Sequence, residues 1–268
     1  MRREVPRRRP KKKPRSLLSK LVVLVVLLAL IVGGIAFIYS SWTEAPSAKI
    51  GVLNINGYVG DFEYADLAEK ARNDSSIKAV VLKINSPGGS VSASFQTETS
   101  ISKLQQEKPV VGSMQQYAAS GAYLIASAAD NLYAYEHTTT AGLGVIAVWV
   151  SYEDYFENKG IDYFVWKTGE QKDMFSIWRK PTPEENEYLQ ELVENYQDSL
   201  FFRIGQNRPN AQLDNIRDGL TVSGWDALEL NLIDGLKTYK QSVKKAAEMA
   251  GLEEGEYSKV KLSEYFKE

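Results

Sequence analysis

The sequence contains no cysteine and a single histidine, His137, among its 268 residues. The lack of cysteine excludes disulfide bonds, zinc–thiolate sites and a cysteine nucleophile. With one histidine, a histidine-rich metal site cannot be built, and a Ser-His-Asp mechanism would have to use His137. That residue lies in Glu-His-Thr-Thr-Thr, a loop-like stretch that favours a surface or structural role.

Charge is split unevenly along the chain. Residues 1–42 carry ten Lys or Arg against one acidic residue, Glu4, and the remainder carries 22 Lys or Arg against 33 Asp or Glu. The near-neutral total therefore combines a basic tail with an acidic body. An acidic body argues against nucleic acid as the main partner.

Residues 21–38 form an uncharged apolar run of 18 residues. As a helix the run would extend about 27 Å, close to the hydrocarbon thickness of a bilayer. It exceeds the usual apolar core of a cleaved signal peptide, and Tyr39-Ser40-Ser41-Trp42 is a poor cleavage site. We predict a basic cytoplasmic tail at residues 1–20, a single transmembrane anchor at 21–42, and a body at 43–268 outside the cytoplasm, because the positive charge lies before the run.

Strand-like and helix-like segments alternate through the first part of the body. Strands are expected at residues 49–55, 79–84, 109–113 and 132–135, and helices at 61–72, 90–107 and 118–129. This order predicts an α/β domain with a largely parallel, buried sheet. Further along, a strand is expected at 163–166 and helices at 183–206, 224–230 and 240–250.

Two motifs follow expected strands. Ser86-Pro87-Gly88-Gly89-Ser90 is a glycine-rich turn whose backbone N–H groups could face a phosphate or a developing oxyanion, although a simple tight turn has the same composition. In Ala118-Ala119-Ser120-Gly121-Ala122-Tyr123, Ser120 could be a nucleophile with the Gly121 amide beside it, or only a helix N-cap.

A lysine could serve as the base that such a serine needs. Lys172 lies in Lys167-Thr168-Gly169-Glu170-Gln171-Lys172-Asp173-Met174. A lysine accepts a proton only where burial or a neighbouring charge lowers its pKa, and the sequence does not reveal burial. Taken alone, Lys172 reads as a solvated surface charge.

Taken in order, these three segments resemble the signal peptide peptidase A family of membrane-bound serine proteases, which have a Clp-protease/crotonase-like fold. The resemblance covers about residues 48–240 and extends to Arg179-Lys180-Pro181-Thr182-Pro183-Glu184-Glu185 and to the segment from Gly219 to Gly235. It implies that Ser120 is the nucleophile, Lys172 the general base, and Gly89 and Gly121 the oxyanion-hole amides. No metal, nucleotide or other cofactor is implied.

The chain departs from the family at two positions. The family loop usually reads T-G-S-I-G-V and its serine helps to orient the lysine amine, whereas this chain has Gly142 there. A nearby hydroxyl, Thr139 or Thr140, could take that role, or the base is held less firmly. Leu220 stands where an arginine is usual. With one catalytic domain the chain resembles the short form, which implies a homo-oligomer.

The resulting expectation is a membrane-anchored endopeptidase that cuts released signal peptides or similar apolar peptides with a Ser–Lys dyad. Three alternatives stay open: a Ser–Lys protease for one specific membrane-protein segment, a catalytically inactive membrane scaffold of this fold, and a crotonase-type enzyme acting on acyl-CoA. The last would need neither Ser120 nor an anchor that places it outside, where CoA is scarce.

Overall fold

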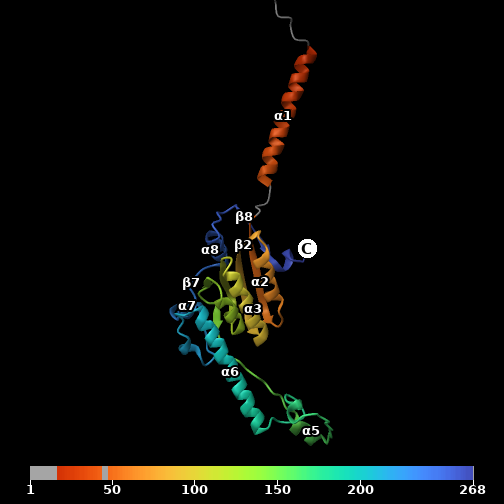
Figure 1. Ribbon diagram of the computed structural model, residues 1–268, viewed down its shortest axis with the longest axis vertical. Coiled ribbons are helices and arrows are strands. Elements are labelled where there is room, and N and C mark those ends of the chain that lie inside the picture. Colours follow the sequence, from red (N-terminus) through yellow and green to blue (C-terminus); the bar gives the residue numbers. More distant parts are fainter. Residues whose placement is uncertain (1–16, 44–47, 268) are drawn as a thin grey trace, which may run out of the picture. The chain divides into compact units, whose positions relative to one another are not determined.

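The computed structural model describes residues 17–43 and 48–267 of the chain. The chain divides into two units, residues 1–45 and residues 46–268. In the first unit, α1 runs over Leu17–Thr43 (Figure 1). Among the described residues, no helix has both the length and the apolar character needed to span a membrane. Most of the predicted basic tail lies outside the described residues, and the anchor at 21–42 stays a prediction.

The second unit is built on one mixed sheet with strand order β6-β5-β3-β2-β1-β8, from which β4 pairs with β3 and β7 with β4. All of these pairs are parallel except β5 with β6. The strands are β1 (Ala48–Val59), β2 (Ile77–Gly89), β3 (Val110–Ala119), β4 (Asn131–Ala134), β5 (Thr139–Ala141), β6 (Thr221–Val222), β7 (Gly235–Leu236) and β8 (Tyr257–Lys261). The expectation of an α/β domain with a largely parallel sheet is confirmed.

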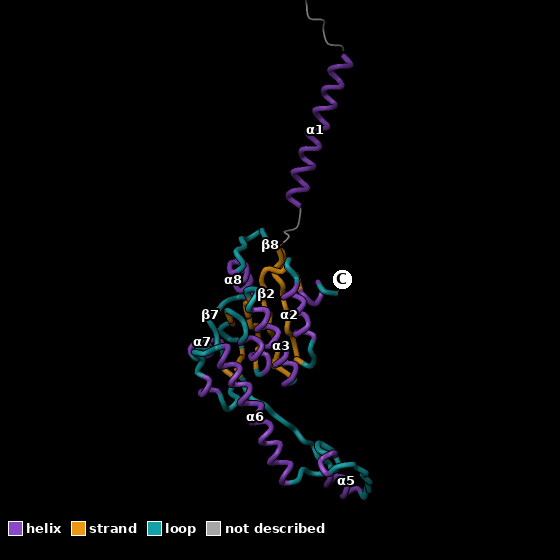
Figure 2. Tube along the Cα trace, viewed as in Figure 1, coloured by secondary structure: helices purple, strands orange, loops and turns teal. Residues whose placement is uncertain are grey.

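Helices cover both faces of this sheet (Figure 2). The α-helices are α2 (Glu63–Asn73), α3 (Val91–Gln105), α4 (Gly121–Ser127), α5 (Glu153–Lys159), α6 (Pro183–Asn207), α7 (Gly224–Glu229), α8 (Tyr239–Met249) and α9 (Leu262–Tyr265), with 3-10 turns η1 (Glu170–Asp173) and η2 (Leu213–Ile216).

Residues 79–82 in the middle of β2 form a continuous apolar run because both faces of the sheet are covered there. Val80 and Leu82 belong to the core cluster with α2, α3 and α4, while Ala79 and Val81 belong to the cluster with α8. Successive side chains of a strand point to opposite faces, so a strand covered on both sides needs apolar residues at every position. Each such side chain stabilises the fold by about 1.5–3 kcal/mol on burial.

Strands β2 and β3 both end later in the chain than the sequence predicts, and their ends carry the two motifs of the candidate site. β2 continues through Ser86 to Gly89, where a turn was expected, because β1 pairs with it as far as Gly89. β3 continues to Ala119, where a helix was expected, because Tyr117 to Ala119 pair with β5. Both motifs therefore lie at the carboxyl ends of adjacent parallel strands, the edge at which ligands bind in open α/β sheets.

We call residues 145–182 the arm. The arm leaves the body after β5, carries α5 and η1, and returns at the start of α6; α5 lies at the end of α6 far from the sheet (Figure 1). The prediction of a strand at residues 163–166 is wrong, because this segment of the arm has no neighbouring strand with which to pair. Its side chains face solvent, with Phe164 76% and Trp166 88% exposed.

Candidate active site

Ser120 joins β3 to α4 with an unusual backbone, φ 54° and ψ −127°. An L-residue avoids this region, so the conformation stores strain of about 1–3 kcal/mol. Its side chain makes no capping hydrogen bond, so the N-cap explanation for this serine fails. Its N–H donates to the Ala141 carbonyl at 2.8 Å, which ties the turn to β5.

The glycine-rich end of β2 packs directly against this turn. A Cβ placed on Gly88, whose φ is 94°, would lie 2.7 Å from the Gly121 nitrogen and 3.0 Å from the Ser120 Cβ. A Cβ on Gly89 would overlap the backbone of Val59. The Ser86 hydroxyl braces this end by donating to the Gly57 carbonyl at 2.5 Å and accepting from the Gly88 N–H at 3.1 Å. Only glycine allows the two strand ends to approach this closely.

A cavity of about 120 Å³ opens beside Ser120. Gly89 and Gly121 line it, so the structure brings together three of the four residues expected from the sequence. As the first residue of α4, Gly121 has no intrahelical acceptor for its N–H, which leaves that donor available for a ligand. The rest of the lining is Val91, Ser94, Phe95, Leu124, Gly144, Val145, Ile146 and Leu200.

Lys172 lies elsewhere. It belongs to η1 in the arm, its side chain is exposed, and it lines a separate cavity together with residues 168–171. Lys172 is not among the residues that line the Ser120 cavity. Within this single chain, the structure therefore does not bring the expected base to the expected nucleophile.

An ion-pair cluster fixes the segment that carries Lys172. Arg179 donates two hydrogen bonds to Asp173, at 2.9 and 3.1 Å, and two to Glu185, at 2.6 and 2.7 Å. Hydrogen bonding from Arg179 lowers the pKa of the Glu185 carboxyl to about 2 and holds the pKa of Asp173 well below its usual range. Because Glu185 also closes the capping box with Thr182, the cluster joins the arm to the start of α6.

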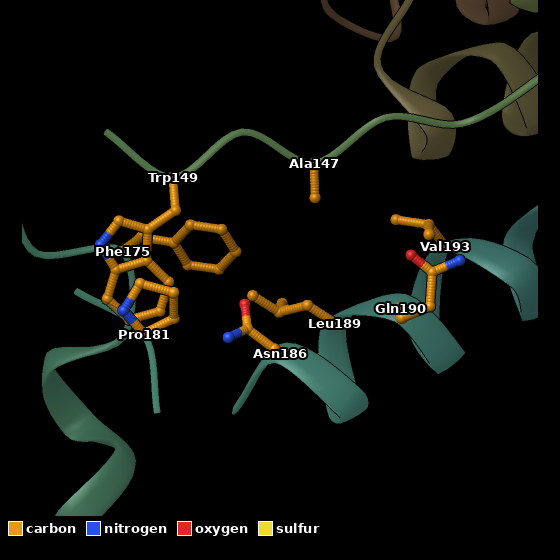
Figure 3. Close-up of a pocket in the computed structure, with 8 residues that line it drawn as sticks. All are labelled: Ala147, Trp149, Phe175, Pro181, Asn186, Leu189, Gln190 and Val193. Carbon is orange, nitrogen blue, oxygen red and sulfur yellow. The ribbon is translucent and has the colours of Figure 1, made fainter. Parts of the chain in front are cut away.

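Aromatic packing adds to this joint (Figure 3). Trp149 stacks on Phe175 with ring centroids 5.3 Å apart, and its indole N–H donates to the Ser176 carbonyl at 2.8 Å. A cavity of about 310 Å³ lies between these rings and the face of α6 that carries Leu189 and Val193. The outgoing segment of the arm, which carries Ala147 and Trp149, therefore faces α6 across this cavity.

The loop that departs from the family has a structural reason for its glycine. Gly142 has φ 57°, and a Cβ there would lie 3.0 Å from Cγ2 of Thr221. A serine at this position would be strained and crowded. The Thr140 hydroxyl, one candidate for orienting the lysine, is fully buried and donates to the Ala118 carbonyl at 2.6 Å.

The sequence reasoning missed Ser94, the one polar side chain besides Ser120 among those lining the cavity. Ser94 lies one helical turn after the N-cap residue Ser90, and a serine on a helix face gives no distinctive signal in the sequence. It also missed Arg179 as the partner of Asp173. In the part of the chain that the structure describes, no three His, Asp or Glu side chains converge as metal ligands do.

The family model for peptidase family S49 matches residues 102–253, more than half of the chain. The chain belongs to this family. It is 34% identical over 205 residues to a provisionally named protease of Methanocaldococcus jannaschii, covering 75% of this chain and 65% of that one. It is 30% identical over 207 residues to a provisionally named signal peptide peptidase SppA of Enterococcus faecium, covering 71% and 60%.

The match thus spans less than two thirds of each of these two relatives. Family membership and the relatives' names support a serine peptidase. Among solved structures, the fold is similar to 1510-N, a membrane-bound stomatin-specific protease solved as a lysine-to-alanine variant with a substrate peptide. The TM-score is 0.51 at 15% identity, covering 75% of this chain and 80% of that one. This likeness supports the Clp-like form of the α/β fold.

Proposed function

We propose that this S49 chain is a serine endopeptidase in which Ser120 is the nucleophile. The observation that carries the proposal is the strained turn at Ser120, which faces a cavity instead of capping α4. Strain of this kind is retained where function requires the conformation. The close approach of Gly88 to Ser120 and Gly121 supports a role for the backbone N–H groups of this turn as donors to the reacting oxygen.

The chemistry follows from these positions. The Ser120 oxygen attacks the carbonyl carbon of the peptide bond while the amine of Lys172 accepts its proton, and the same lysine then protonates the leaving amine. Water, giving a proton to Lys172, next attacks the resulting ester, which releases the acid product and restores the Ser120 hydroxyl. The N–H groups of Gly89 and Gly121 hold the oxygen that becomes negative. A single donor of this type is worth about 3–4 kcal/mol in the transition state.

We propose that the active form is a homo-oligomer in which the arm of one copy lies on its neighbour. Two observations support this. Lys172 lies outside the Ser120 cavity of its own chain, so the site is incomplete in one copy. The arm also exposes large apolar side chains that a soluble monomer would bury, among them Ile146, Val148, Phe164 and Trp166.

The proposed setting is the outer face of a membrane. The apolar run at residues 21–38 and the basic residues before it support a single anchor with the catalytic unit outside. Peptides that leave the bilayer, such as cleaved signal peptides, would then meet a site tethered close by. The apolar side chains that line the Ser120 cavity support a substrate of this apolar kind.

A second candidate is an inactive membrane scaffold, favoured by one specific observation, the separation of Lys172 from Ser120. A Ser–Lys protease for one membrane-protein segment would use the same site as the main proposal and differ only in its substrate.

The test uses the full chain in detergent as wild type, Ser120→Ala, Lys172→Ala and a control, Lys159→Ala, which removes an exposed lysine from the same arm. Each is incubated with an apolar signal-sequence peptide over a range of pH. We expect cleavage by wild type and by Lys159→Ala and none by the other two, with wild-type activity rising with pH. Cleavage by Lys172→Ala at the wild-type rate would refute the dyad; a folded but silent wild type would favour the scaffold.

A further inference from the structure

The Ser94 hydroxyl is a buried polar group without a partner. Ser94 lies in the first half of α3 and is 2% exposed, and its oxygen makes no hydrogen bond within the described part of the chain. Leaving a buried hydroxyl unpaired costs about 1–3 kcal/mol. A group that the fold leaves unsatisfied at such a cost calls for an explanation, and a bound ligand is one.

Its position is next to the proposed catalytic turn. A Cβ placed on Gly121 would overlap the Ser94 oxygen, and the same point lies 3.6 Å from the Gly89 nitrogen. Ser94 therefore neighbours both amides proposed to hold the oxyanion. Val91, Ser94 and Phe95 present one face of α3 to the cavity, opposite Leu124 of α4.

The walls of the cavity limit what can enter. Val91, Phe95, Leu124, Val145, Ile146 and Leu200 line it with apolar side chains. A charged side chain would lose its hydration there without an opposite charge to replace it. The volume, about 120 Å³, favours a small side chain.

We propose that Ser94 makes the enzyme select substrates whose residue before the cut is serine or threonine. This inference rests on the proposed function, because the side chain of that residue enters the cavity only if Ser120 attacks its carbonyl. A small hydroxyl would fill the cavity and pair with Ser94. An alanine would leave the Ser94 hydroxyl unpaired, as it is in the free enzyme, whereas a serine would gain a hydrogen bond. Sites built to bind a hydroxyl discriminate against ligands that lack it.

The experiment compares two peptides of one apolar sequence that differ only in serine or alanine before the cut, with the cut position read by mass spectrometry. We expect wild type to favour the serine peptide by about tenfold in kcat/KM. Ser94→Ala should lose this preference and cut the alanine peptide at least as fast as wild type does.

The chain provides a matched control in Ser100. It lies on the same helix, is 1% exposed and also has an unpaired hydroxyl, but it does not line the cavity. Ser100→Ala should keep the wild-type preference. Neither substitution should lower the thermal midpoint, because each removes an unpaired buried polar group.

A binding measurement separates this inference from the proposed function. Product peptides that end in serine or alanine are titrated into wild type and Ser94→Ala by calorimetry. Tighter binding of the serine product by wild type alone supports the role of Ser94 even if no peptide is cleaved, in which case only the proposed function fails. Equal binding of the two products by wild type, or equal cleavage of the two substrates, overturns the role of Ser94.

Discussion

Ser120 combines two requirements that usually conflict in one residue. The position demands a backbone conformation that glycine adopts freely, yet the proposed chemistry demands a side-chain oxygen. The chain therefore accepts strain at the nucleophile and surrounds it with residues that can approach it, Gly88, Gly89 and Gly121. Stability and activity should consequently respond in opposite directions to changes at this residue.

The comparison of Ser120→Gly with Ser120→Ala tests this. Both should abolish cleavage, but Ser120→Gly should be more stable by about 1 kcal/mol, because relief of backbone strain exceeds the entropic cost of glycine in the unfolded chain. Chemical denaturation of the two variants in the same detergent measures the difference. If Ser120→Ala proves the more stable of the two, the backbone at Ser120 is not strained.

Individual residues of the site differ in how far the sequence could predict them. Ser120, Gly89 and Gly121 could be grouped from the sequence only through the family resemblance. The structure gives the physical reason for the grouping, because their motifs end the neighbouring parallel strands β2 and β3. Ser94 escaped because a serine on a helix face has no distinctive pattern until its lack of a partner is known. The placement of Lys172 could not be foreseen, because it depends on how the arm folds.

At the scale of elements, the arm contrasts with the sheet. Strands β1, β2 and β3 could be anticipated from β-branched and aliphatic segments, whereas residues 163–166, Tyr-Phe-Val-Trp, also have high β-propensity and form no strand. An apolar segment indicates that its side chains become buried, but it does not say against what or in which type of secondary structure. In the arm, that cover is absent from the single chain, so composition alone predicts the wrong element.

The joint between arm and α6 should depend on pH through Glu185 and Asp173. The folded pKa of Glu185 is lowered from 4.5 to about 2, so its ionised form stabilises the joint above 4.5 and that contribution is lost as pH falls toward 2. Asp173 acts in the same direction. The Cζ atom of Arg179 lies 5.0 Å from the centroid of the Trp149 ring, so loss of the joint should expose this ring to water. We therefore expect tryptophan emission from the arm to shift to longer wavelength as the pH falls over this range.

The variant Arg179→Ala should remove this pH response, because the joint is already broken at neutral pH. Lys180→Ala is the control, since the Lys180–Asp154 pair is more than half exposed and contributes little. An acid response in Arg179→Ala that matches wild type would show that other groups control the arm.

At the scale of the whole molecule, the proposed homo-oligomer can be tested by combining two variants in one assembly. If the arm of one copy brings Lys172 to Ser120 of the next, two inactive variants should repair each other. Ser120→Ala and Lys172→Ala, co-expressed in equal amounts and purified together through different tags, should recover at least about a quarter of wild-type activity. Random mixing gives one neighbour pair in four with both intact residues, and the two tags remove the oligomers made of one variant alone.

Separately purified variants mixed after blocking exchange between oligomers serve as the control and should stay inactive. If the co-purified assembly is intact but silent, each site must take its serine and lysine from the same copy. The arm would then have to swing toward the body of its own chain.

The sheet order also has a consequence for biosynthesis. Among the strands that the structure describes, β1 is made well before β8, which is one of its two partners. While the ribosome extends the chain, the outer edge of β1 therefore stays unpaired and open to strands of other molecules. Synthesis of β8 closes that edge, so nascent chains that stall before Tyr257 should be the ones that aggregate or require a chaperone.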